Sequence, residues 1–507
     1  MGIPSYFRGI LQKYPSCLIN SVKSGTLCFD FNCLIYRCIR AASMPKYPEG
    51  AYTDSEENED WERALLVEIE KTVLEVWSIA GKPHTVYIAV DGVVPMAKIR
   101  QQRVRRFKSS WLRKTVGASR CEWDTNSITP GTKFMEKLGM MLKALALRSG
   151  KWIVSGVDEE GEGEHKIMNW LRKEKVNGPV VVYGLDADLI LLTMLVSEQK
   201  SLDMFLLREK QEFSKEVSST QLYQFLTISE FKMRLGLSGE EEVLNYIGLM
   251  SLMGNDFLPH SLTHKLSDGG HDCVIGELYR LRKTGWLVGL NGKFKHDVLI
   301  QIFKKWSIDE EGRILQMIHK KREQASRGIG KGMDVSEGLP LEWAVEKEFM
   351  TGGAKGGLSE GWRDIYWTWI HPYWTEEHKD YICAEYLKGF QWILDYYQGI
   401  PVNKSWMFPA WIPPLWSDLS SYVKEVGHIE LEDVSPEPQE QLAMVLPLES
   451  WGLIRSHALR RLPTLSPQMW PLNFGFFSLG RKWLWECEAR IPVLTAGRLR
   501  EILRTGV

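Results

Sequence analysis

The sequence predicts an α/β fold, with a largely parallel sheet flanked by helices, followed by a second, mainly helical region rich in tryptophan. In the first 300 residues or so, short apolar runs alternate with longer segments of helical apolar spacing. Of the 21 tryptophans, 12 lie from Trp362 onward, among many prolines. That much aromatic surface must be buried, so we expect the second region to pack against the first.

Four apolar runs are the expected strands, at residues 26–31, 85–92, 151–157 and 180–186. The segments with helical apolar spacing between them are residues 62–79, 132–147 and 164–173. Strands that alternate with helices in this way are typical of a parallel sheet, because a crossover helix returns the chain to the same edge.

Two polar segments interrupt this pattern. Residues 53–60, TDSEENED, form an acidic run that we expect to be a solvated loop. Residues 326–360 are polar and rich in glycine, which favours a flexible connection. The expected organisation is therefore an α/β core at 1–325, a connection at 326–360 and a second region at 361–507.

Charge and targeting signals narrow the class of protein. The chain has 63 Lys and Arg against 64 Asp and Glu, and the net charge of −1 argues against a polyanion-binding protein unless the charges are segregated. No apolar run is long enough to cross a membrane, and the N-terminus lacks the apolar core of a signal peptide. The 8 cysteines are scattered, which argues against a zinc site and favours a reduced, intracellular chain.

Acidic residues follow the ends of the expected strands and one later apolar segment. They are Asp30, Asp91, Glu162, Glu164, Asp186, Asp188 and Asp256. A single acid at such a position commonly caps a helix. Seven at one sheet edge would repel one another unless cations neutralised them, and Mg²⁺ or Mn²⁺ prefers oxygen ligands. The pattern indicates metal-assisted phosphodiester hydrolysis.

A basic segment follows Asp91 directly. It holds 8 Lys or Arg and no acid between Lys98 and Lys114, and Pro95 is well placed to open a helix. Four of its side chains fall on one helical face: Lys98, Gln102, Arg105 and Arg106. Many basic helices are only solvated surface, but this face beside the acids is suited to bind a phosphate.

Several strings resemble, in order, the XRN family of 5′→3′ exoribonucleases. They are MGIPSYFRGILQKYP, FDFNCLIY, VDGVVPMAKIRQQRVRRF, ITPGTKFMEKL, GEGEHKIM, YGLDADLILL and LMGNDFLPH, followed after the Gly-rich segment by YLKGFQWILDYYQGIP, WMFP, SDL and EQLAMVLP. The resemblance covers nearly the whole chain and two conserved regions only, which implies a short form without a C-terminal extension.

The resemblance implies a PIN/flap-nuclease-like core closed by the second region. It implies two Mg²⁺ ions, which Mn²⁺ can replace, and processive degradation of single-stranded RNA with a 5′ monophosphate. It makes all seven acids metal ligands and makes the four residues of the basic face the pocket for the 5′ phosphate. Such a pocket is too small for a cap or a triphosphate.

The sequence departs from the family pattern at two positions. Tyr36 stands where family members usually carry a histidine that stacks on the terminal base, and a tyrosine ring can still stack. Lys404 replaces the first tryptophan of a family motif, whereas Trp406 is kept. Trp406 is as compatible with core packing as with base stacking, so Tyr36 and Trp406 are both candidates for that contact.

We expect a monomer that acts in RNA or mRNA decay, downstream of a decapping activity and without a membrane. The lack of a basic import cluster outside residues 98–114 favours the cytoplasm. Two alternatives stay open. One is a flap-type DNA nuclease, which GNDFLPHSLTHKL disfavours because it lacks the expected Gly-rich helix-turn-helix. The other is an RNA-binding or structural protein with vestigial nuclease activity.

Overall fold

The computed structural model of the chain describes residues 6–116, 122–209, 222–326, 351 and 356–506, the last stretch with breaks at 423, 425, 433, 478, 480 and 482–485. Most of the predicted Gly-rich connection therefore lies outside the described residues, and the division at 325 and 361 stays a prediction. Among the described helices, none is both long and apolar enough to cross a membrane.

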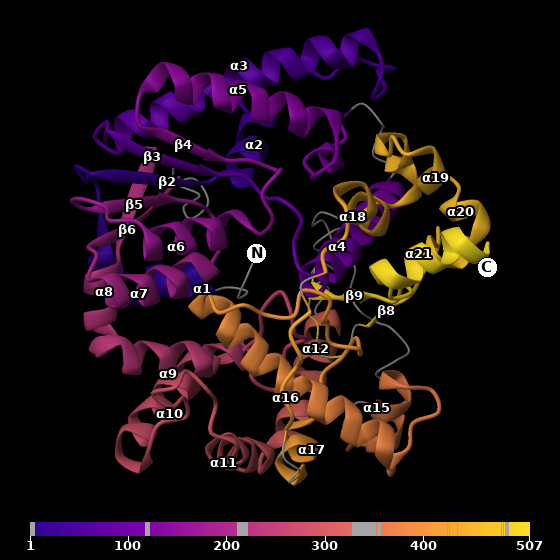
Figure 1. Cartoon of the computed structure of the whole chain (residues 1–507). Coiled ribbons are helices and arrows are strands. Elements are labelled where there is room, and N and C mark those ends of the chain that lie inside the picture. The colour runs from indigo at the N-terminus through magenta and orange to yellow at the C-terminus, as the bar shows by residue number, and fades with distance from the viewer. Residues whose placement is uncertain are drawn as a thin grey trace.

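A seven-stranded sheet forms the centre of the described structure (Figure 1). Its strands, in spatial order, are β1 (Leu18–Ile19), β7 (Tyr223–Thr227), β6 (Met204–Glu209), β5 (Val180–Tyr183), β2 (Thr26–Asp30), β3 (Thr85–Ala89) and β4 (Trp152–Ser155). The five strands from β6 to β4 are parallel, and β7 and β1 complete one edge antiparallel. The four strands predicted from the sequence are β2, β3, β4 and β5.

Helices cover both faces of the sheet (Figure 1). One face carries α2 (Asn32–Ile39), α3 (Glu56–Ile79) and α5 (Lys133–Ser149), and the other carries α6 (Gly163–Lys173) and α7 (Asp188–Lys200). Alternate side chains of β2 enter the two cores: Leu27 and Phe29 pack with α3 and α5, whereas Cys28 packs with α6 and α7. This alternation follows from the two-residue period of a strand.

The expectation of a loop over residues 53–60 is wrong for its second half. Residues 56–60 form the first turn of α3, whose N-terminus is capped by the Ser55 hydroxyl through the backbone N–H of Asn58. Three acids lie in that first turn. Negative charges near a helix N-terminus are stabilised by the helix dipole, so the acidic run favours helix formation at this position.

Further helices pack around this sheet or lie beyond it. They are α1 (Tyr6–Lys13), α4 (Met96–Val116), α8 (Ile228–Arg234), α9 (Gly239–Ser251), α10 (Gly270–Thr284), α11 (His296–Ser307), α12 (Glu310–Ser326), α15 (Trp362–Ile370), α16 (Glu376–Gln398), α17 (Trp416–Ser421), α18 (Pro438–Val445), α19 (His457–Arg460), α20 (Leu462–Leu465) and α21 (Ala496–Thr505). Short 3₁₀ helices and a two-stranded ribbon of β8 (Phe476–Phe477) with β9 (Glu488–Ala489) complete the described chain.

The second region is mainly helical and packs on the first. Trp367, Trp416 and Trp470 are among its largest fully buried side chains. The core that surrounds α6, α7 and α9 continues into α16 and α17, and a separate core joins α4 to α18 and α21. The predicted fold class, a mostly parallel α/β sheet with a helical, Trp-rich region packed on it, is confirmed.

Helix α4 is one of the elements that join the two regions (Figure 1). The guanidinium of Arg100 donates to the backbone carbonyls of Phe408 and Ala410, and that of Arg103 donates to those of Met444 and Met469. Arg103 is buried and Arg100 is half-buried, and loss of hydration lowers the pKa of Arg100 to about 10 and that of Arg103 to about 9. Part of the basic segment therefore attaches the second region and does not face a ligand.

Candidate active site

Three neighbouring parallel strands bring the first acids together. Asp30 ends β2, Asp91 lies just past β3, and Asp186 lies just past β5. The backbone N–H of Gly163 donates to Asp91 Oδ1 at 2.7 Å, and the Asn32 amide donates to Asp91 Oδ2 at 2.9 Å. A Cβ at Gly163 would lie 2.7 Å from Asp30 Oδ1, so this glycine permits the close approach of α6 to the acids.

The other four acids come from helix starts and one loop. Glu162 and Glu164 lie at the start of α6, Asp188 begins α7, and Asp256 follows α9. Each of the seven carboxylates that the sequence predicts interacts electrostatically with at least one other. The structure therefore brings the whole predicted set together at one edge of the sheet.

Burial and mutual repulsion shift the titration of these acids. Burial, together with the charge of Asp256, raises the pKa of Asp188 to about 7. Burial and then the charges of Asp188 and Glu162 raise the pKa of Glu164 well above its usual range. A buried group of like charges is costly without a counter-charge, which is the electrostatic setting of a cation site.

Lys98 is part of this cluster. Its Nζ lies 2.5 Å from Glu162 Oε2 and 2.7 Å from Asp256 Oδ2, with the side chain only 10% exposed. Burial alone would lower the pKa of Lys98, but the charges of Asp256 and Glu162 outweigh it and raise the pKa well above its ordinary value. The basic face of α4 and the acids at the sheet edge are thus in direct contact.

The other members of the basic face lie beside Lys98. Gln102 and Arg106 are buried and Arg105 is half-buried. Gln102 Oε1 and Arg106 Nη1 are buried without a hydrogen-bond partner in the part of the chain that the structure describes. Tyr36, 38% exposed, lies within electrostatic range of Arg106. The assignment of these residues to a phosphate pocket and a stacking contact stays a prediction.

The motif that holds Lys404 and Trp406 lies where the second region meets the loop between β4 and α6. Trp406 is 8% exposed, donates its indole N–H to Glu385 at 2.9 Å and packs against Trp392. Lys404 Nζ lies 2.5 Å from Glu160 Oε2, and its carbonyl accepts from the backbone N–H of Met96 at the start of α4. Trp406 therefore packs in the core, and its contact with a base stays a prediction.

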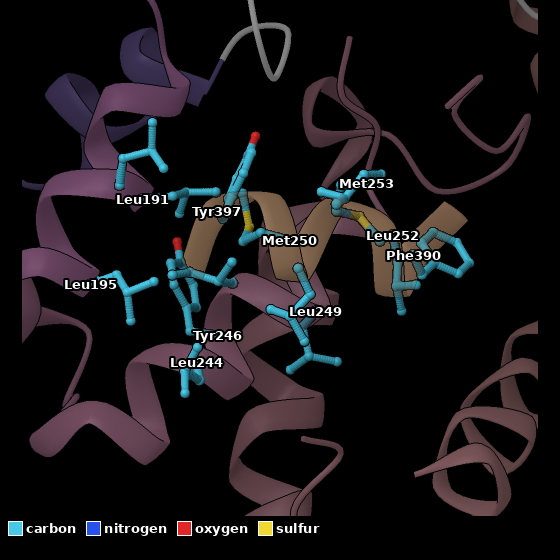
Figure 2. Close-up of a cluster of buried hydrophobic side chains, with 14 of the residues drawn as sticks. Leu191, Leu195, Leu244, Tyr246, Leu249, Met250, Leu252, Met253, Phe390 and Tyr397 are labelled. Carbon is cyan, nitrogen blue, oxygen red and sulfur yellow. The ribbon is translucent and has the colours of Figure 1, made fainter. Parts of the chain in front are cut away.

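Sequence reasoning missed three aromatic residues that contact the acids or lie among them. From α16, Tyr396 donates to Glu162 Oε1 at 3.0 Å and Tyr397 donates to Asp188 Oδ2 at 3.1 Å. Figure 2 shows Tyr397 on α16 beside Leu191 of α7 and Met250 of α9. His165 stacks on the Tyr396 ring, with centroids 3.7 Å apart. The signals were the adjacent tyrosines of YLKGFQWILDYYQGIP and the histidine of GEGEHKIM.

Two groups of donor atoms fit a divalent cation. Within the described ranges, oxygens of Asp30, Glu164 and Asp186 lie within 4.8 Å of one another, as do donor atoms of Glu162, Glu164 and His165. Glu164 belongs to both groups, and its Oε2 is buried with no hydrogen bond to any described residue. Carboxylate oxygens at this density suit Mg²⁺ or Mn²⁺, and the specific ion stays a prediction.

Comparison with known proteins gives the family. The family model described as "XRN 5'-3' exonuclease N-terminus" matches residues 1–210, and the one described as "Xrn1 helical domain" matches residues 358–505. The second match begins near the start of the predicted second region. Together the two models account for most of the chain.

Curated relatives agree with these matches. The chain is 28% identical to human (Homo sapiens) 5'-3' exoribonuclease 1 over all of its own length, which spans 34% of that protein. It is 22% identical to the Drosophila melanogaster 5'-3' exoribonuclease 2 homolog, with 99% of this chain and 71% of that protein covered. It is 32% identical to Schizosaccharomyces pombe 5'-3' exoribonuclease 1 over 51% of this chain and 22% of that protein.

A solved structure described as "The catalytic core of Rad2 in complex with DNA substrate (complex III)" overlaps 64% of this chain and 76% of its own, at 14% identity and a TM-score of 0.33. An overlap at that TM-score supports no argument about activity. The family assignment rests on the two family models and the named relatives, and the first model spans all of the predicted acids except Asp256. The chain belongs to the XRN family.

Proposed function

We propose that this chain is a 5′→3′ exoribonuclease. It degrades single-stranded RNA that bears a 5′ monophosphate, processively, to nucleoside 5′-monophosphates by two-metal-ion hydrolysis, and it serves RNA or mRNA decay. One observation carries the proposal: the basic face of α4 touches the carboxylates, through Lys98 between Glu162 and Asp256. A site that binds a terminal phosphate beside a metal-binding acid cluster acts on the first phosphodiester bond. The names of the relatives support the same activity.

The side chains of the basic face determine which end of the RNA the protein binds. Lys98, Gln102, Arg105 and Arg106 bind the 5′ monophosphate through charge-assisted hydrogen bonds, for which the unpartnered atoms of Gln102 and Arg106 are available. Because these side chains are buried or half-buried, the pocket accepts a compact anion and rejects a cap or a triphosphate. Tyr36, which is exposed and within electrostatic range of Arg106, stacks on the first base.

The carboxylates hold two Mg²⁺ ions, which Mn²⁺ can replace. Asp30, Glu164 and Asp186 form one group of donors, and Glu162 with Glu164 belongs to the second. Bound there, the ions supply the charge that stabilises the attacking and leaving oxygens of an in-line displacement. Tyr396 and Tyr397 orient Glu162 and Asp188 by hydrogen bonds, and Asn32 orients Asp91. These three acids therefore have fixed orientations before substrate binds.

The decisive experiment compares RNAs of one sequence that differ at the 5′ end. With Mg²⁺ we expect the monophosphate RNA to be degraded from its 5′ end, the hydroxyl, triphosphate and capped RNAs to persist, and a chelator to stop the reaction. The substrate would then be supplied by a reaction that leaves a 5′ monophosphate, such as decapping. Stable monophosphate RNA with intact, Mg²⁺-loaded protein would overturn the proposal.

Two further arms separate the alternatives. The double variant D186N/D188N should retain RNA binding and lose hydrolysis; if the biological role survived that change, the protein would be an RNA-binding component. DNA of the same sequence, single-stranded or as a flap, tests the DNA nuclease alternative, since a protein distinguishes RNA from DNA through the 2′-hydroxyl. Faster cleavage of flap DNA than of RNA would favour it.

A further inference from the structure

A buried histidine lies next to two of the carboxylates without an evident role in phosphodiester hydrolysis. His165 is 4% exposed and follows Glu164 at the start of α6. Its Nε2 is buried and makes no hydrogen bond to any described residue, and the same is true of Glu164 Oε2. Buried polar atoms are almost always partnered, so two unpartnered acceptors in adjacent side chains point to a ligand between them.

The imidazole ring is held in one orientation from the second region. Tyr396 of α16 stacks on it with an interplanar angle of 28° and donates its hydroxyl to Glu162 Oε1 at 3.0 Å. The backbone of Tyr396 also hydrogen-bonds the imidazole. A histidine that donates one ring N–H to a backbone carbonyl presents a lone pair on its other nitrogen, which is the usual arrangement of a metal-ligating histidine.

The donor atoms converge on one position. A ligand nitrogen of His165 and one oxygen each of Glu162 and Glu164 lie within 4.8 Å of one another. An ion with bonds of about 2.1 Å spans opposite ligands that are about 4.2 Å apart, so a small contraction closes the site. Lys98 and Tyr396 each contact one oxygen of Glu162, but a carboxylate oxygen has two lone pairs and can also bind a metal.

We propose that His165 is a direct ligand of the divalent cation that Glu162 and Glu164 hold, which makes this position a mixed nitrogen–oxygen site with a preference for Mn²⁺ over Mg²⁺. The inference rests on the proposed function in taking these glutamates as metal ligands, and it goes beyond the all-carboxylate site expected from the sequence. Imidazole binds transition-metal ions well, whereas Mg²⁺ is bound through oxygen and keeps its water.

Pulsed electron paramagnetic resonance tests the ligand directly. The full chain, loaded with one equivalent of Mn²⁺ and no RNA, should show the hyperfine coupling of a directly coordinated nitrogen, and its frequencies should change when the protein carries ¹⁵N-labelled histidine. A wild-type spectrum without nitrogen coupling overturns the proposal. This measurement needs no variant and no nuclease activity, so its result is independent of whether RNA is degraded.

Substitution then identifies the histidine. His165→Phe keeps a flat ring against Tyr396 and removes both nitrogens, and the exposed His84→Gln is the matched control. We expect H165F to lose the nitrogen coupling and to weaken Mn²⁺ binding about tenfold or more, with Mg²⁺ binding changed less than about threefold. H84Q should retain the coupling. Coupling that persists in H165F, or equal weakening of both metals, contradicts the assignment.

Discussion

The two regions differ in what they bring to the carboxylates. The sheet region supplies the charges, at the ends of β2, β3 and β5 and at the starts of α6 and α7. The second region supplies neutral contacts: the hydroxyls of Tyr396 and Tyr397 to the acids, and backbone carbonyls to the arginines of α4. The sheet region therefore sets which charges are present, and the second region helps to orient two of them, Glu162 and Asp188. Changes to the first should alter chemistry most, and changes to the second should alter geometry and stability.

Glu164 offers the largest effect, because it belongs to both groups of donor atoms. Glu164→Gln should lower kcat about 1,000-fold or more, since it removes charge from both candidate metal positions. It should also raise the melting temperature of the metal-free protein, because a buried carboxylate next to Asp188 and Glu162 is lost. Single-turnover kinetics and thermal melts with and without Mg²⁺ measure both effects.

The control for Glu164 is Glu174→Gln, an exposed position at the end of the same helix. It should match wild type in both measurements. A melting temperature of metal-free E164Q below that of wild type would mean that the Glu164 carboxylate stabilises the fold. That result would contradict the expected repulsion among the buried acids when no cation is bound.

His264 tests the contact between the regions through pH. It accepts the indole N–H of Trp416 on Nδ1 at 3.1 Å and stacks on Trp306, and burial lowers its pKa from 6.5 to about 4. The unfolded chain therefore binds a proton at a higher pH than the folded chain. His264 therefore makes its full contribution to the free energy of unfolding above pH 6.5. This contribution, about 3 kcal/mol, is lost as the pH falls toward 4.

The measurement is the difference in unfolding free energy between wild type and His264→Asn at several pH values. Asn can still accept from Trp416 but does not titrate, so the difference should shrink as the pH falls from about 6.5 to about 4. The exposed His84→Gln is the matched control variant. A constant difference for H264N would mean that the imidazole is not buried in a neutral form.

Tyr397→Phe removes one hydroxyl of the second region without changing ring packing. It should lower kcat about tenfold with little change in KM, since the orientation of Asp188 is relaxed while the substrate contacts are kept. The stability cost of the lost hydrogen bond is about 1 kcal/mol. Tyr381→Phe, an exposed position on the same helix, is the control and should have neither effect. A loss confined to KM would place Tyr397 against the RNA instead.

The sequence predicted the site residues whose positions depend on their neighbours in the chain, and these lie mainly in the sheet region. Asp30, Asp91 and Asp186 follow apolar strands, and Lys98 with Arg106 follows helical spacing, so their neighbours in the chain indicate their position. The contacts of Tyr396, Tyr397 and Lys404 could not be found in this way, because each joins residues more than 200 positions apart. Their partners depend on how two regions dock, and apolar periodicity carries no information about docking.

Lys404 gives the smallest expected effect and tests whether the second region also binds the loop between β4 and α6 by charge. Its ion pair with Glu160 is partly exposed, with the two side chains 32% and 48% exposed, and such pairs contribute less than about 1 kcal/mol. Lys404→Met should therefore lower stability by less than that amount at low salt, and the difference should disappear at high salt. RNA degradation should change less than about twofold, because the backbone carbonyl that holds Met96 is kept. If degradation instead fell tenfold with stability unchanged, Lys404 would contact the RNA itself, and the second region would supply charge to the site as well as orientation.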